Sequence, residues 1–214
     1  MRPVVILAGG EPVAAGVLSD LPDDAWVIAA DSGLDQALAL GLDVHLRVGD
    51  FDSASPEAMH AYRHVPEERW PADKDATDLE IAMQGAVLHG AERIVVVGGH
   101  GRRLDHHLGN ASLLASPDFA GIDVEWLAGD ARVHVVHVAV ELHGSAGDVV
   151  SLIPAGGDAV QVNTEGLRWE LADAILPFGT SRGISNELAR PVARVRLGAG
   201  TLLVVLPGQV GTDP

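Results

Sequence analysis

Cysteine is absent from this chain of 214 residues. Its absence excludes a disulfide scaffold, a thiolate metal site and a cysteine nucleophile. Long apolar runs are absent too. The run near the start covers only residues 4–8, and no run reaches the roughly 18 residues that a membrane-spanning helix needs. We therefore expect a cytoplasmic protein with no membrane segment.

Aromatic and basic residues are both scarce. Aromatic residues make up 4% of the chain, so the core must consist mainly of Val, Leu, Ile and Ala. The formal net charge is −16, and the sequence has no basic stripe, which argues against a nucleic-acid partner. Lys74 is the only lysine in the chain. Because lysine and arginine differ as phosphate ligands, that position is of interest.

The first half of the chain alternates short apolar runs with helical spacing. Buried strands are predicted over residues 3–8, 26–30, 44–48, 94–97 and 124–127. Helices are predicted between them, over residues 34–41, 77–90 and 104–115. Strands that alternate with helices predict an α/β domain with a largely parallel, Rossmann-like sheet.

The second half changes character near Gly129. Its short strands are punctuated by Gly and Pro, and no helical spacing is convincing. Strands are predicted in the β-rich run around 133–140 and over residues 148–153, 159–162, 167–169, 192–197 and 201–206. This pattern predicts a C-terminal antiparallel β-sandwich. We divide the chain into residues 1–129 and 130–214, and expect the two parts to pack together.

Acidic turns follow the predicted strands of the first half. Ligands bind beyond the carboxyl ends of the strands in an open parallel sheet, so these turns should lie along one rim. Asp50, Asp52, Asp75 and Asp78 offer the hard oxygen ligands that suit Mg²⁺. Lys74 lies among them and can meet phosphate oxygens as a point charge.

Further features of this rim suit a phosphate ligand. The glycine-rich turn after residues 94–97 lets backbone N–H groups approach a phosphate closely, and Arg103 within it offers a guanidinium fork. Helices that begin near Thr77 and Leu104 would add the attraction of their N-termini for anions. Together these residues favour Mg-nucleotide binding and phosphoryl transfer.

Each of these features also has an ordinary structural explanation. Thr77 or Asp75 can simply cap a helix, and Asp50-Phe51-Asp52 alone is common turn chemistry. His106 and His107 are adjacent and cannot share one helix face, so we do not expect both to bind a metal. The coincidence of the segments at strand ends is what favours the functional interpretation.

Three ordered motifs carry a family resemblance. They are Gly49-Asp50-Phe51-Asp52-Ser53, Lys74-Asp75-Ala76-Thr77-Asp78 and Gly98-Gly99-His100-Gly101-Arg102-Arg103-Leu104-Asp105-His106. In order and approximate spacing they resemble the motifs of thiamine pyrophosphokinase, and Asp31-Ser32-Gly33 is similar to its early aspartate-glycine turn. Residues 164–169 and 179–187 resemble motifs of its second domain, so the resemblance spans nearly the whole chain. Arg102 departs from the pattern, because it stands where a glycine is expected.

The resemblance implies an α/β catalytic domain that binds ATP and Mg²⁺, followed by a β-sandwich that binds thiamine. It implies a homodimer whose thiamine site lies at the subunit interface. In the implied reaction, ATP gives a diphosphate group to the thiamine hydroxyl, yielding thiamine diphosphate and AMP.

The resemblance also assigns roles to individual residues. The implied catalytic residues are Asp50, Asp52, Asp75, Asp78 and Lys74, with Asp50, Asp52 and Asp75 as metal ligands. The implied nucleotide-binding residues are Asp31, Gly33, Ser53, Thr77, Gly98, Gly99, Gly101, Arg103, Asp105 and His106. The implied thiamine-side residues are Trp169, Ser185 and Asn186. For Trp169 the alternative is an aromatic residue in the core of the sandwich.

Other functions compete with this one. A diphosphokinase that acts on a pterin alcohol would use similar chemistry, and a thiamine- or nucleotide-binding module could have lost turnover. Asp50-Phe51-Asp52-Ser53 after a strand also suggests an aspartyl-nucleophile phosphatase. Such an enzyme would need a later lysine near a second acidic pair, and the second half of the chain supplies no lysine.

Overall fold

The computed structural model describes residues 3–101 and 103–211. Arg102, where the sequence departs from the family pattern, lies outside the described residues. Six strands of the first half form a parallel array in the spatial order β4-β3-β2-β1-β5-β6. They are β1 (Pro3–Ala8), β2 (Trp26–Ala30), β3 (Leu46–Gly49), β4 (Glu67–Arg69), β5 (Arg93–Gly98) and β6 (Asp123–Ala128).

The central parallel strands are apolar along their whole length because both of their faces are covered. In β1 and β5 every residue after the first is buried. This is the pattern expected of a parallel sheet between two layers of helices. The helices are α1 (Gly33–Leu40), α2 (Pro56–Ala61), α3 (Asp78–Leu88) and α4 (Leu104–Leu114), with 3-10 turns at Ala15–Asp20 and Pro117–Phe119.

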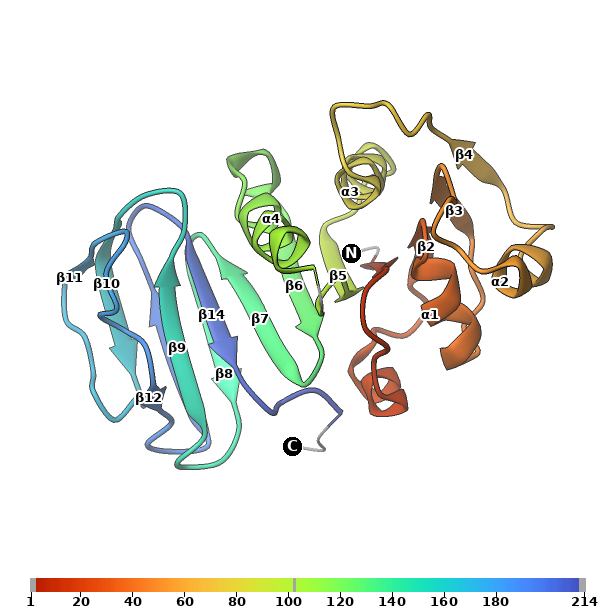
Figure 1. The fold of residues 1–214 in the computed structure, drawn as a ribbon. Helices are drawn as coiled ribbons and strands as arrows, with labels where there is room; N and C mark the ends of the chain where they lie inside the picture. Colours follow the sequence, from red (N-terminus) through yellow and green to blue (C-terminus); the bar gives the residue numbers. More distant parts are fainter. Residues whose placement is uncertain (1–2, 102, 212–214) are drawn as a thin grey trace.

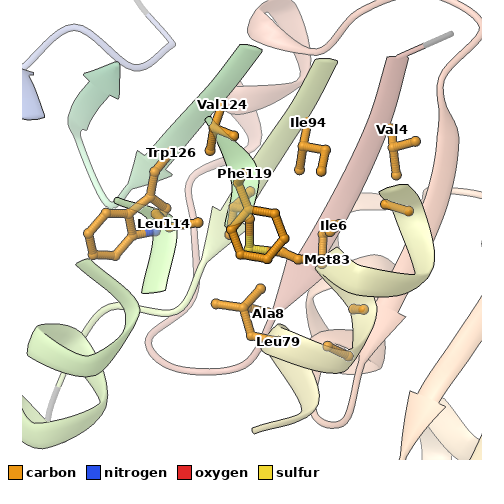
Figure 2. Close-up of a cluster of buried hydrophobic side chains, with 14 of the residues drawn as sticks. Val4, Ile6, Ala8, Leu79, Met83, Ile94, Leu114, Phe119, Val124 and Trp126 are labelled. Carbon is orange, nitrogen blue, oxygen red and sulfur yellow. The ribbon is translucent and has the colours of Figure 1, made fainter. Parts of the chain in front are cut away.

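Helices α3 and α4 cover one face of this array, whereas α1 and α2 pack in a separate cluster on the other (Figure 1). In the first cluster, Leu79 and Met83 of α3 point onto the strands that carry Ile6 and Ile94 (Figure 2). Trp126 closes the cluster beside α4, and its indole N–H donates to the Gly98 carbonyl over 2.7 Å. Packing in this cluster thus fixes the positions of the carboxyl ends of β1 and β5.

The C-terminal half extends the same sheet. The chain turns at Gly129 into β7 (Ala131–Val136), which pairs antiparallel with β6. Strands β14 (Leu202–Leu206), β9 (Val149–Pro154) and β12 (Asn186–Glu187) follow as antiparallel neighbours, so one sheet of ten strands spans both halves. The left part of Figure 1 shows these strands lying side by side next to the parallel array.

A second, four-stranded sheet completes the sandwich. Its spatial order is β11-β10-β13-β8, formed by β8 (Ala139–His143), β10 (Ala159–Glu165), β11 (Ala174–Leu176) and β13 (Val192–Arg196). In β13 buried and exposed residues alternate, as expected of a strand with one face on a core. Leu152 and Val204 of the large sheet and Val195 of the small one lie in the shared core. The predicted fold class, α/β followed by antiparallel β, is confirmed.

Two of the predicted strands need correction, and the sequence pattern missed some short elements. The predicted strand over 167–169 is wrong: Leu167 makes only an isolated bridge to Leu188, and Trp169 lies in a loop. The strand predicted over 44–48 runs from Leu46 to Gly49 instead. The sequence pattern also missed α2 and the short β4, which has three exposed residues and so carries no apolar signal. Among the described residues, no helix is long and apolar enough to cross a lipid bilayer.

A charged network ties the two halves together at the junction of β6 and β7. Glu125 has only 3% of its surface exposed, and it is ion-paired with Arg93 of β5 at 2.9 Å and with Arg132 of β7. Arg132 also pairs with Asp20 near the N-terminus. A buried carboxylate between two guanidiniums is costly to break, because its partners would then be left without a counter-charge.

We therefore expect Glu125→Gln to destabilise the protein by about 2 kcal/mol. Breaking a buried pair costs roughly 3–5 kcal/mol, and we take less because the two arginines are partly exposed. Chemical denaturation monitored by circular dichroism measures the effect. Glu141→Gln, which removes an exposed partner of Arg194, is the control and should shift the midpoint far less. Equal midpoints for Glu125→Gln and the unmodified chain would contradict the role of this network.

Candidate active site

A cleft of about 710 Å³ opens at the carboxyl ends of the parallel strands. It lies where the strand order reverses, because β1 is flanked by β2 on one side and by β5 on the other. Such a switch point is where open α/β sheets bind their ligands. The predicted site residues that line it are Asp31, Asp50, Ser53, Lys74, Thr77, Asp78, Gly99, Arg103 and His106.

Three carboxylates at this edge can share one cation. Asp31 follows β2, and Asp50 and Asp52 follow the neighbouring β3. One oxygen from each lies within 4.8 Å of the others, the spacing of a metal-binding group. The backbone N–H of Asp31 donates to the Val48 carbonyl over 2.8 Å, which holds the two strand ends together.

The state of Asp31 fits a cation ligand. Its Oδ1 atom is buried and has no hydrogen-bond partner among the described residues. Burial raises the pKa of Asp31, and the nearby carboxylates of Asp78, Asp50 and Asp52 raise it further against a hydrogen bond from the Ser32 backbone. A cation at this point would supply the counter-charge that the carboxylate lacks. Asp75 is exposed and is not part of the group, so its assignment as a metal ligand stays a prediction.

Lys74 links this group to helix α3. Its Nζ lies 3.3 Å from Asp50 Oδ2 and 3.1 Å from Asp78 Oδ1. Burial lowers the pKa of Lys74, but the contacts with Asp78 and Asp50 outweigh it and raise the pKa overall. For Asp50, a hydrogen bond from the Asp52 backbone lowers the pKa most, and Lys74 lowers it further. Both groups are therefore charged at neutral pH, and the lysine faces the cleft with a positive charge.

The two sides of the cleft are joined by backbone contacts. The Gly99 N–H donates to the Gly9 carbonyl over 2.7 Å, and the Glu11 N–H donates to the His100 carbonyl over 2.9 Å. Gly98 has φ +84°, and a Cβ there would lie 2.6 Å from the Ala8 carbonyl oxygen. A side chain at Gly98 would therefore push the two turns apart. Gly101, also predicted to bind nucleotide, has φ +120° and does not line the cleft.

Gly33 has a structural role beneath the cleft. A Cβ at Gly33 would lie 2.0 Å from the Leu7 carbonyl oxygen, so glycine is what lets α1 pack closely on β1. Thr77 caps α3, since its hydroxyl accepts a hydrogen bond from the Glu80 backbone over 3.2 Å. Thr77 therefore fits both the structural and the functional interpretation, because it caps α3 and also lines the cleft.

Arg103 lies at the mouth of the cleft, at the start of α4. Two of its nitrogens donate to the Asp105 carboxylate over 2.9 and 2.6 Å, and this contact lowers the pKa of Asp105. Asp105 itself faces a smaller hollow of about 300 Å³ that shares Thr77 and His106 with the main cleft. The fork of Arg103 is thus held by a neighbouring carboxylate rather than by the core.

Several lining residues were not predicted. Asn110 lies one helical turn after His106 on α4, and its amide donates to the Gly99 carbonyl over 2.8 Å. Because Asn110 lies four positions after His106, on the same helix face, it could have been predicted from the sequence. Ser32 and His100 belong to the strand-end motifs that the sequence singled out, but they were assigned no role, and neither were Gly10 and Glu11, which lie shortly after β1. Burial lowers the pKa of His100.

The three thiamine-side candidates lie elsewhere. Trp169 is 52% exposed, which excludes a core role, and the Arg168 guanidinium lies 4.7 Å from its ring centroid. Asn186 of β12 is buried, and its amide accepts from the Trp169 N–H over 3.1 Å and donates to the Trp169 carbonyl over 2.8 Å. Asn186 therefore holds the Trp169 loop, and Ser185 beside it is exposed.

Within one chain, these residues are far from the cleft. Strands β9, β14, β7, β6 and β5 separate β12 from β1. At the usual spacing between strands, β1 and β12 lie roughly 29 Å apart along the sheet. None of the three residues lines the cleft.

Comparisons with known proteins identify the family of the chain. Residues 19–126 match the family described as "Thiamin pyrophosphokinase, catalytic domain", and residues 133–202 match "Thiamin pyrophosphokinase, vitamin B1 binding domain". The chain belongs to the thiamin pyrophosphokinase family. The family resemblance read from the sequence and the enzyme class that it implied are confirmed.

Two bacterial relatives match along nearly the whole chain. The thiamine pyrophosphokinase of Bacillus subtilis is 26% identical over 96% of this chain and 98% of its own length. A crystal structure of the B. subtilis enzyme superposes with a TM-score of 0.85, at 23% identity over 96% of this chain and 99% of that one. That of Geobacillus thermodenitrificans gives 0.82 at 26% identity, covering 99% and 98% of the two chains.

We expect Asp31→Asn to stabilise the metal-free protein while removing its response to Mg²⁺. The substitution relieves the repulsion that Asp31 shares with Asp50, Asp52 and Asp78, and we expect the Tm to rise by about 2–4 °C. The unmodified chain should gain stability when Mg²⁺ is added, because a ligand that binds only the folded state raises the Tm. Differential scanning fluorimetry with EDTA or MgCl₂ measures both effects.

The control for this prediction is Asp118→Asn, an exposed carboxylate on the 3-10 turn Pro117–Phe119. It should leave both the Tm and the Mg²⁺ response as they are. A Mg²⁺-dependent rise in Tm that survives Asp31→Asn would remove this carboxylate from the metal site.

Proposed function

We propose that the chain catalyses transfer of a diphosphate group from ATP to the hydroxyl of thiamine, giving thiamine diphosphate and AMP. Membership of the family carries the class of reaction, and ATP is the co-substrate that this family uses. The observation that supports the chemistry is the group of Asp31, Asp50 and Asp52 beside Lys74, at the switch point of the sheet. The match to a vitamin B1 binding domain supports thiamine over a pterin alcohol as acceptor.

The residues of the cleft fit the handling of a triphosphate. Asp31, Asp50 and Asp52 would hold Mg²⁺, with Asp75 as a further candidate. When bound, the ion would supply positive charge to phosphate oxygens. Lys74 already faces the cleft with its charge, and it can exchange one of its two carboxylate contacts for a phosphate oxygen. Arg103 at the mouth offers a second cation, in a fork that suits two phosphate oxygens.

In the reaction, the thiamine hydroxyl oxygen attacks the β-phosphorus of ATP. The bond between that phosphorus and the oxygen bridging to the α-phosphate breaks, AMP leaves, and the hydroxyl proton is released. Phosphoryl transfer depends mainly on positioning and charge neutralisation, which is what this edge of the sheet provides. Asp78 is our candidate to receive the proton, because it lies beside Lys74 and lines the cleft.

A complete site needs two copies of the chain. The roughly 29 Å between β1 and β12 is too long for one thiamine molecule to reach both the cleft and Trp169 of the same chain. We therefore propose a homodimer in which the cleft of one subunit faces the Trp169 loop of the other. The exposed aromatic face of Trp169 would stack on the flat, cationic thiamine.

We also keep the expectation of a cytoplasmic protein.

We expect Asp52→Asn to lower thiamine-dependent AMP release by at least ~100-fold, the scale on which one positioned charged group acts in a transition state. Asp52 is exposed, so folding should be unaffected. The assay follows AMP formation from ATP with thiamine, with a pterin alcohol, or with no acceptor. Near-normal AMP formation by the folded variant would exclude Asp52 from the mechanism. AMP formation only with the pterin alcohol would overturn the assignment of thiamine.

The dimer is tested by complementation. Asp52→Asn damages the cleft and Trp169→Ala damages the thiamine side, so each variant alone should be inactive or weak. After subunit exchange, half of the dimers are hybrids with one intact site, and about a quarter of the original activity should return. Mixtures that gain nothing, although mass spectrometry shows exchange, would place both halves of the site in one subunit.

A further inference from the structure

Phe51 stands between two of the carboxylates of the metal group in a conformation that its residue type rarely adopts. Its φ is +64°, in the left-handed region, and its side chain is buried. A bulky residue keeps such a backbone only where its surroundings impose it. The consequence of this conformation is local: Asp50 and Asp52, on either side of Phe51, both contribute an oxygen to one group.

Two arginines surround the Phe51 ring. The guanidinium of Arg47 lies 5.5 Å from the ring centroid, and that of Arg69 lies 5.4 Å from it. Glu67 joins them, since its carboxylate is 2.8 Å from a nitrogen of each arginine. We call Arg47, Phe51, Glu67 and Arg69 the Phe51 clamp. The pairing of β3 with β4 explains it, because Arg47 is registered opposite Glu67, and Arg69 opposite Gly49.

The clamp also touches the backbone of the metal group. Arg69 Nη1 donates to the Asp50 carbonyl over 3.3 Å, and the Trp70 N–H donates to the Gly49 carbonyl over 3.1 Å. Arg47 is anchored from the other side, where its Nε donates to the Val65 carbonyl over 3.2 Å. The three residues of β4 are exposed and add nothing to the apolar core, so the contribution of this strand is to bring Glu67 and Arg69 to the turn.

From this geometry we propose that the Phe51 clamp is a positioning device for the metal site. Arg69 and Glu67 do not contact the cation. They hold Phe51 in its left-handed conformation, and thereby hold Asp50 and Asp52 in place to bind one divalent ion. This inference rests on the proposed function, because it takes the group of Asp31, Asp50 and Asp52 as the metal site.

Simple electrostatics and the proposed positioning role predict opposite effects of one substitution, Arg69→Met, on the binding of a divalent cation. Arg69→Met removes a positive charge close to the carboxylates, so charge alone would make a divalent cation bind more tightly. If the clamp positions the ligands, the same substitution weakens binding, and we expect about a tenfold loss, as for other supports of metal ligands. The side chain of Arg69 is 58% exposed, so its replacement leaves no buried cavity.

The experiment measures Mn²⁺ binding to the full chain without nucleotide, by electron paramagnetic resonance of the free ion. The variants are Arg69→Met, Phe51→Leu and, as a matched control, Arg63→Met. Arg63 carries the same charge but contacts His60 on the neighbouring helix rather than Phe51. We expect both clamp variants to bind about tenfold more weakly than the unmodified chain and Arg63→Met to bind equally well or slightly better.

Binding by Arg69→Met that is equal to or tighter than that of the unmodified chain overturns the clamp. If Phe51→Leu does not fold, Arg69→Met alone decides. Asp52→Asn should abolish Mn²⁺ binding at this site, so that the signal of the free ion stays at its full height. If Asp52→Asn binds Mn²⁺ as well as the unmodified chain does, the metal group is assigned to the wrong residues, and the proposed role of the Phe51 clamp is wrong as well. Thiamine-dependent AMP release by the unmodified chain tests the proposed function separately. The clamp alone is wrong if that activity is present while Arg69→Met retains full Mn²⁺ affinity.

Discussion

Repulsion between like charges at the end of a parallel sheet is the constraint on which this structure depends. Asp31, Asp50, Asp52 and Asp78 converge there, and Lys74 offsets only part of their charge. Carboxylates would move apart in water, so a rigid support is needed to keep them together. The buried, paired strands β2 and β3, which end just before these carboxylates, and the hydrogen bond from the Asp31 N–H to the Val48 carbonyl provide that support. The apolar core and the acidic edge are thus two parts of one arrangement.

The two halves of the chain meet different demands. The first half concentrates charge at a cleft, whereas the second presents an aromatic ring on a loop whose backbone is fixed by the buried amide of Asn186. Asn186 thus fixes the backbone of Trp169, as Glu67 fixes Arg47 and Arg69 beside Phe51. In both places, a buried or paired polar group fixes a more exposed neighbour.

Much of this could be read from the sequence, and the exceptions have physical causes. Unbroken Val and Ile runs predicted the parallel strands because such strands are covered on both faces, and Thr77 was recognised because capping is a local interaction. The role of Asp31 depends on how close β2 and β3 end in space, which sequence spacing does not encode. Leu167 and Trp169 show the alternation of a strand, but tertiary contacts leave Trp169 in a loop. The exposed strand β4 is held in place by the pairing of Glu67 with Arg47 and Arg69, and hydrophobic periodicity does not detect such a strand.

The unbroken sheet has a mechanical consequence. Strands β6 and β7 are joined by a continuous ladder from Val124–Val135 to Ala128–Ala131, so rotation of one half against the other would have to break those bonds. The chain therefore contains no hinge at the point where many two-part enzymes close on their substrates. The cleft beside β1 and the Trp169 loop beside β12 are therefore carried by one continuous sheet, which keeps the separation between them fixed within the chain.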